Sequence, residues 1–138
     1  MKSLPWSLPA LLVACTLQAQ PRSQLPDPVE FPENRWVDLG RLGKRDLVAD
    51  REALSARGRE RGVWVRLHGS ERPNSPAGLF IYDYYIIDCE GGRNRYHMRL
   101  YVFDKIVHNS TGMTSEWKPI EPGSVPDRLC KLELRGAA

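Results

Sequence analysis

Basic side chains occupy alternate positions of one predicted strand, residues 93–103, and they are the strongest candidates for binding chemistry. The basic-type residues are Arg93, Arg95, His97 and Arg99, and the residues expected on the opposite face are Tyr96, Met98, Leu100 and Val102. Alternate residues of a strand lie about 6.6–6.8 Å apart on one face. The pattern predicts an exposed row that suits sulfated polysaccharide, acidic protein segments or lipopolysaccharide phosphates. A solvated outer face that discourages sheet pairing is the alternative interpretation.

Catalytic and metal-binding patterns are missing from the sequence. The three histidines, His68, His97 and His108, lack the short spacings of a zinc site, and neither H-E-x-x-H nor C-x-x-C occurs. A cysteine nucleophile would need a reduced thiol at Cys89. Gly91 and Gly92 follow a strand but are expected to turn a hairpin rather than cradle a phosphate. We therefore predict a protein that is not an enzyme and that uses no metal or cofactor.

The charge balance argues against a nucleic-acid partner. The chain of 138 residues carries 20 lysines and arginines against 17 aspartates and glutamates, a formal net charge of +3. Nucleic-acid binding would require a concentrated basic face, which so mild an excess does not indicate. Eleven prolines and eleven glycines favour short strands and turns over long helices. A chain of this length has room for one domain.

Residues 1–19 have the composition of a secretory signal. One lysine, Lys2, precedes an apolar run of about ten residues, well short of the roughly 20 that a membrane-spanning helix requires. Leu12-Val13-Ala14-Cys15 has the form of a lipobox, which predicts cleavage before Cys15 and its lipidation. The alternative is ordinary cleavage after Ala19. The expected product is an outer-membrane lipoprotein or cell-surface protein, anchored through Cys15, or otherwise a periplasmic protein.

Export to an oxidising compartment also affects whether the remaining cysteines form a disulfide. Whether Cys15 is lipidated or removed, Cys89 and Cys130 are left as an even pair. Because disulfides persist in oxidising compartments, we predict a disulfide between them. The alternative is two unpaired, buried thiols.

The rest of the chain reads as a proline-rich tether followed by one domain. Residues 20–34 carry four prolines and no apolar periodicity, so a tether with little ability to pack is predicted there. Residues 35–138 form the predicted domain, of the α+β class and mostly β: one antiparallel sheet of about five or six strands with a short C-terminal helix pinned by the disulfide. Expected strands are 35–39, 46–49, 62–68, 79–89, 93–103 and 106–109. Within 62–68, Val63, Val65 and Leu67 are expected on one face and Trp64, Arg66 and His68 on the other.

Several residues have expected roles within this domain. The segment 79–89 is apolar on both faces, so it should be a central strand covered on both sides, or half covered by a partner chain in a homodimer. Asp50 should cap one helical turn and Ser124 should cap the C-terminal helix, with Pro126 tolerated in the first turn. The tryptophans are interpreted as core or edge anchors: Trp36, Trp64 and Trp117.

From about Trp36 to Cys130 the chain resembles the surface-adhesin protein E-like family of bacterial exported proteins. The similar pieces, in order, are Trp36-Val37-Asp38-Leu39, Val63-Trp64-Val65-Arg66, Ile87-Asp88-Cys89, Val107-His108-Asn109-Ser110, Glu116-Trp117-Lys118-Pro119-Ile120, Pro122-Gly123-Ser124 and a late cysteine. The resemblance implies an antiparallel sheet, a C-terminal helix, and a cysteine pair matching Cys89 and Cys130. The chain departs from the family pattern in the segment from Ser124 to Cys130. This segment is shorter than the usual helix before the cysteine and contains Pro126, so a helix of one or two turns is expected there.

The family name implies binding to host extracellular-matrix proteins. Taken with the basic row, this predicts an exported binding module, an adhesin that captures host matrix protein or a sulfated polyanion through a sheet face. The alternative hypothesis is a periplasmic, envelope-associated structural protein with no host ligand.

Overall fold

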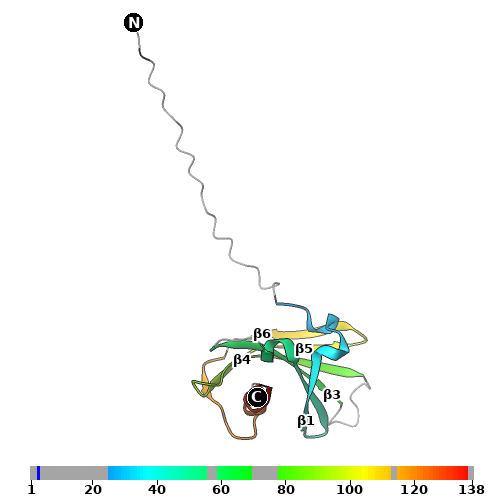
Figure 1. Cartoon of the computed structure of the whole chain (residues 1–138). Coiled ribbons are helices and arrows are strands. Elements are labelled where there is room, and N and C mark those ends of the chain that lie inside the picture. Colours follow the sequence, from blue (N-terminus) through cyan, green and yellow to red (C-terminus); the bar gives the residue numbers. More distant parts are fainter. Residues whose placement is uncertain (1–2, 4–24, 56–58, 70–77, 113–114, 137–138) are drawn as a thin grey trace.

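A curved antiparallel sheet with a helix on its inner side forms the body of the protein (Figure 1). The computed structural model describes residues 3, 25–55, 59–69, 78–112 and 115–136. The predicted signal segment with Cys15, and residues 20–24 of the predicted tether, lie outside the described residues. Within the described ranges, no helix is long and apolar enough to cross a membrane.

The sheet has seven strands, one more than the upper expectation, and the mostly β fold is confirmed. Six strands pair in chain order: β1 (Trp36–Leu42), β2 (Arg45–Asp50), β3 (Arg61–His68), β4 (Leu79–Asp88), β5 (Arg93–Phe103) and β6 (Ile106–Gly112). A two-residue strand, β7 (Lys118–Pro119), pairs with the start of β5. Helix α1 (Arg51–Ser55) follows β2 and is capped as predicted, because Asp50 Oδ1 accepts a hydrogen bond from the backbone N–H of Glu52.

The inner face of the sheet, which faces the C-terminal helix α2 (Val125–Gly136), holds the larger apolar core. Its buried members are Leu47, Ala49, Val63, Val65, Leu67, Ile81, Ile87, Val125 and Leu129. The alternation predicted for β3 is confirmed, because Val63, Val65 and Leu67 all belong to this core.

Helix α2 is longer than expected. It spans 12 residues, about three turns, rather than one or two. Pro126 lies in its first turn, where a backbone N–H has no partner within the helix, so the missing donor does not interrupt it. The predicted cap is present, since the Ser124 hydroxyl accepts a hydrogen bond from the Asp127 N–H at 3.3 Å.

The predicted disulfide joins the end of β4 to this helix. Cys89 and Cys130 are bonded, with their Cα atoms 5.7 Å apart. The covalent link therefore holds α2 against the sheet at the end of the central strand.

The opposite, outer face of the sheet carries a second, aromatic core built on Trp36, Trp64, Tyr82 and Val102. It is covered by residues 25–35, here called the N-terminal arm, which contains the 3-10 turns η2 (Pro28–Glu30) and η3 (Glu33–Arg35). Pro28 is buried, and Leu25, Val29 and Phe31 pack against the aromatic core. The prediction of poor packing is wrong for residues 25–34, because the prolines shape turns that fit an otherwise uncovered face. The cover predicted for both sides of β4 is thus supplied by the chain itself.

Candidate binding site on the outer face

The four residues of the predicted basic row do not lie on one face, because β5 contains a bulge. Tyr84 of β4 pairs with Met98, but the next residue, Tyr85, pairs with Tyr96. His97 is therefore an extra residue on β5. A bulge of this kind reverses the inward and outward assignment of the residues on one side of it.

The bulge separates Arg99 from the other basic residues. Arg95 pairs with Ile86, which alternates with Tyr84 and Tyr82 of the outer face. Arg99 pairs with Asp83, which alternates with Ile81 of the inner core. The predicted alternation is also wrong for the apolar side chains of the strand. Met98, Leu100 and Val102 join the outer core and so share a face with Arg95.

On the inner face, Arg99 forms an ion pair with a buried carboxylate. Its Nε and Nη2 lie 2.7 and 2.8 Å from the two carboxylate oxygens of Asp83, which is 1% exposed. The Tyr96 hydroxyl donates a further hydrogen bond to Asp83 Oδ1 at 3.1 Å. Hydrogen bonding to Asp83 raises the pKa of Arg99, while burial, followed by the Asp83 charge, raises the pKa of Tyr96. Arg99 is therefore committed to a structural contact and is not available to an external anion.

Arg93 lies on the outer face but is neutralised by two carboxylates. Its Nε is 3.0 Å from Asp88 Oδ2, and its Nη2 is 3.1 Å from Glu60 Oε1. Asp88 has no exposed side-chain surface and also accepts hydrogen bonds from Arg59 Nε and the Gly91 N–H, at 2.9 and 2.8 Å. The charge of Arg93 is therefore largely offset within the protein.

These contacts make the stability of the protein sensitive to acid. The hydrogen bond from the Gly91 N–H, followed by those from Arg59 and Arg93, lowers the pKa of Asp88 from 3.8 to about 2. A carboxyl group with a lowered pKa binds fewer protons when folded, so its stabilisation is present above about pH 4 and is lost as the pH falls toward 2. Urea unfolding over this range should show a smaller decline for Asp88→Asn than for the wild type.

The exposed aspartate Asp46 provides a matched control for that experiment. Asp46→Asn should retain the acid-induced decline that Asp88 causes. Equal slopes for the wild type and Asp88→Asn would contradict the assignment.

Among the three arginines of β5, Arg95 is the one without a carboxylate partner in the described part of the chain. Its guanidinium carbon lies 4.8 Å from the ring centroid of Trp117, and that of Arg93 lies 4.2 Å from the same centroid. Pairing of Lys118 and Pro119 with the start of β5 places the Trp117 ring over the strand. We call Arg93, Arg95 and Trp117 the Arg–Trp cluster. His97 lies beside it, with its ring 5.6 Å from that of Tyr84.

Trp117 is the functional candidate that the sequence interpretation missed. Trp36 and Trp64 are core residues, 8% and 3% exposed, as predicted. Trp117 is partly exposed and stacks with arginines instead. In the sequence, the charged neighbours Glu116 and Lys118 indicated that Trp117 lies near solvent, and both neighbours are exposed in the structure.

The part of the chain that the structure describes contains no group of three or more histidine, cysteine or acidic residues able to hold a metal ion. No family model, curated protein or solved structure matches this chain. The adhesin-like resemblance therefore stays a prediction, and the site is interpreted from its own chemistry.

Proposed function

We propose that this protein is an exported binding module that captures sulfated polyanions through the Arg–Trp cluster. The observation that carries the proposal is Arg95, a partly exposed residue whose guanidinium has no carboxylate partner among the described residues and lies over the ring of Trp117, itself partly exposed. An arginine held against an aromatic ring is already ordered, so it loses less side-chain entropy when it binds an anion.

The chemistry of the cluster suits a sulfated sugar chain. A guanidinium group donates parallel hydrogen bonds to sulfate oxygens, and an aromatic ring offers an apolar face beside it. Arg93 adds donors to the cluster, but the carboxylates of Asp88 and Glu60 reduce its contribution. Arg95 is therefore expected to supply most of the electrostatic attraction.

A sulfated polyanion fits the cluster better than a matrix protein does. Protein interfaces depend on well-packed, fully desolvated anchors near their centre. The Arg–Trp cluster instead offers one aromatic ring among charged groups, including Glu60 and Lys118. We therefore place the host matrix protein second as a partner.

The proposed setting is the outer membrane, with a lipid on Cys15 and the domain at the cell surface. Protease treatment of intact cells, followed by detection of the domain, tests this setting. A domain that is cut only after the outer membrane is opened would favour the alternative, a periplasmic envelope protein without a host ligand.

The binding site itself is tested with Arg95→Glu and immobilised heparin. We expect heparin affinity to fall by at least about tenfold, because a charge-assisted contact worth roughly 1.5–3 kcal/mol is replaced by repulsion. Surface plasmon resonance at constant ionic strength measures the loss. Circular dichroism and thermal unfolding confirm that the fold is intact.

Lys44→Glu is the matched control, since it makes the same charge change at an exposed position in the β1–β2 turn. It should reduce heparin affinity much less than Arg95→Glu. Equal losses in the two variants would mean that only net charge matters, and unchanged binding by Arg95→Glu would reject the site.

A further inference from the structure

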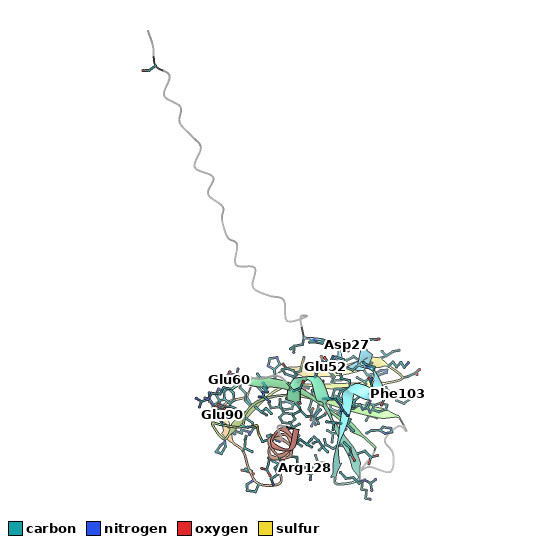
Figure 2. The ribbon with its side chains drawn as sticks, in the orientation of Figure 1. Asp27, Glu52, Glu60, Glu90, Phe103 and Arg128 are labelled. Atoms are coloured by element: carbon teal, nitrogen blue, oxygen red, sulfur yellow. A yellow bond between two sulfur atoms is a disulfide. The ribbon has the colours of Figure 1, made fainter. Side chains whose placement is uncertain are left out.

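A pocket of about 460 Å³ lies on the outer face, between the N-terminal arm and the β5–β6 turn. Its lining includes Phe31, Arg66, Phe80, Tyr82, Phe103 and Lys105. This volume falls within the range of roughly 300–1,000 Å³ that small-molecule sites occupy. The pocket adjoins the last residues of β5, whereas Arg93 begins that strand, and these two ends of β5 are about 30 Å apart at the rise of a strand. Figure 2 shows Phe103 and Glu60, the partner of Arg93, toward opposite ends of the sheet.

Arg66 is held in this pocket by packing against aromatic rings. Its guanidinium carbon lies 4.9 Å from the ring centroid of Trp36 and 5.3 Å from that of Phe80, and its side chain is 14% exposed. Its Nε is buried and has no hydrogen-bond partner in the described part of the chain. Aromatic rings therefore contact the guanidinium, and its hydrogen bonds are made by Nη1 and Nη2 rather than by Nε.

The anionic partner of Arg66 is held much less firmly. Glu33 of the N-terminal arm accepts hydrogen bonds from Arg66 Nη1 and Nη2 at 3.0 and 3.3 Å, one to each carboxylate oxygen. The Glu33 side chain is 82% exposed. An ion pair with one solvated partner contributes little free energy, so another carboxylate can replace Glu33 at low cost. Glu33 thus marks where the carboxylate of a ligand would bind.

We propose that this pocket binds a small organic carboxylate with a planar apolar body. The carboxylate would take the place of Glu33 on Arg66, and the apolar body would pack against Phe80, Tyr82 and Phe103. Phe103 is 38% exposed, which leaves aromatic surface available for that contact. This ligand differs in size and class from the polyanion proposed for the Arg–Trp cluster, and it binds at a different site.

The rim of the pocket favours an anion over a cation. Lys105 lies at the rim. Once Glu33 is displaced, the pocket lining carries two positive charges, Arg66 and Lys105, and one negative charge, Asp104. Asp104 and Lys105 have φ values of 52° and 61°, left-handed conformations that non-glycine residues rarely adopt. The hairpin thus holds a lysine at the rim at some cost in backbone strain. A cationic ligand would meet these positive charges and gain nothing from Arg66.

The test compares 2-naphthoate, which has the proposed chemistry, with its neutral analogue 2-naphthamide. Ligand-observed nuclear magnetic resonance titrations on the full-length chain, which keeps the N-terminal arm, measure both affinities. We expect 2-naphthoate to bind at least about tenfold more tightly than 2-naphthamide, because only the carboxylate forms a charged fork with Arg66. Equal affinities, or no binding of 2-naphthoate at millimolar concentration, would overturn the proposal.

Two variants separate a binding role from a structural one. Glu33→Gln removes the competing carboxylate and should tighten 2-naphthoate by about threefold while leaving 2-naphthamide unchanged. Arg66→Met should abolish the preference for the carboxylate. If Arg66→Met unfolds, Glu33→Gln still decides, since weaker or unchanged 2-naphthoate binding in that variant contradicts the proposal. Heparin binding at the Arg–Trp cluster should not change in Glu33→Gln, so failure of one proposal does not imply failure of the other.

Discussion

Reduction of the Cys89–Cys130 disulfide is expected to lower the free energy of unfolding by about 4 kcal/mol. The bond closes a loop with a sequence separation of 41 residues, and opening it restores conformational freedom to the unfolded chain. In thermal unfolding this loss corresponds to a decrease of about 15 °C in the melting temperature of a domain of this size. Urea unfolding with and without dithiothreitol measures the change.

The double variant Cys89→Ala/Cys130→Ala is the control for that experiment. It should unfold like the reduced wild type, and dithiothreitol should not alter it further. Because the bond holds α2, whose Val125 and Leu129 belong to the inner core, weakened packing of this helix should accompany the loss. A melting temperature that does not respond to reduction would show that packing alone holds the helix in place.

Arg99→Met is expected to destabilise the domain by about 3–5 kcal/mol. Asp83 is 1% exposed, and without Arg99 its carboxylate would stay buried with the Tyr96 hydroxyl as its remaining side-chain donor among the described residues. A buried charge without its partner costs more than the intact pair contributes. Urea unfolding at pH 7 measures the loss. Heparin affinity of the folded variant should be unchanged, because Arg99 does not face the Arg–Trp cluster.

A double-mutant cycle distinguishes an unpaired charge from lost packing. Asp83→Leu/Arg99→Met should be more stable than Arg99→Met by at least about 2 kcal/mol, because no charge then remains buried. Arg41→Met, which breaks an exposed pair with Asp46, should change stability by no more than about 0.5 kcal/mol. A double variant that is less stable than both Asp83→Leu and Arg99→Met would show that side-chain shape, rather than charge, dominates the stability at this position.

Much of the fold could be predicted from local pattern. Alternating apolar residues in β3 predicted its buried face, because side chains on a strand alternate whatever the strand pairs with. The cap of α2 by Ser124 was predictable for a similar reason, since it depends on a hydrogen bond over three residues. The disulfide followed from the parity of the cysteines and the predicted signal segment.

The candidate site was harder to predict because it depends on contacts between distant segments. The bulge at His97 arises from the pairing of β4 with β5, and the sequence of β5 alone shows uninterrupted alternation. Packing of the N-terminal arm likewise depends on an aromatic face that exists only once the sheet has formed. Proline content predicted that the arm would not be regular, but not that it would pack against the sheet.

Local patterns and the cysteine count were therefore enough to predict the strands, the helix cap and the paired cysteines, because these features depend on residues close together in the chain or on a simple count. Which arginines can bind a ligand depends instead on contacts that form only when the domain folds. Arg93 and Arg99 are neutralised by Asp88 and Asp83, which lie on the neighbouring strand and come within about 3 Å only when β4 pairs with β5. Arg95 meets Trp117 instead of a carboxylate. The availability of a charge depends on the groups that surround it in space, and spacing along the chain does not reveal those groups.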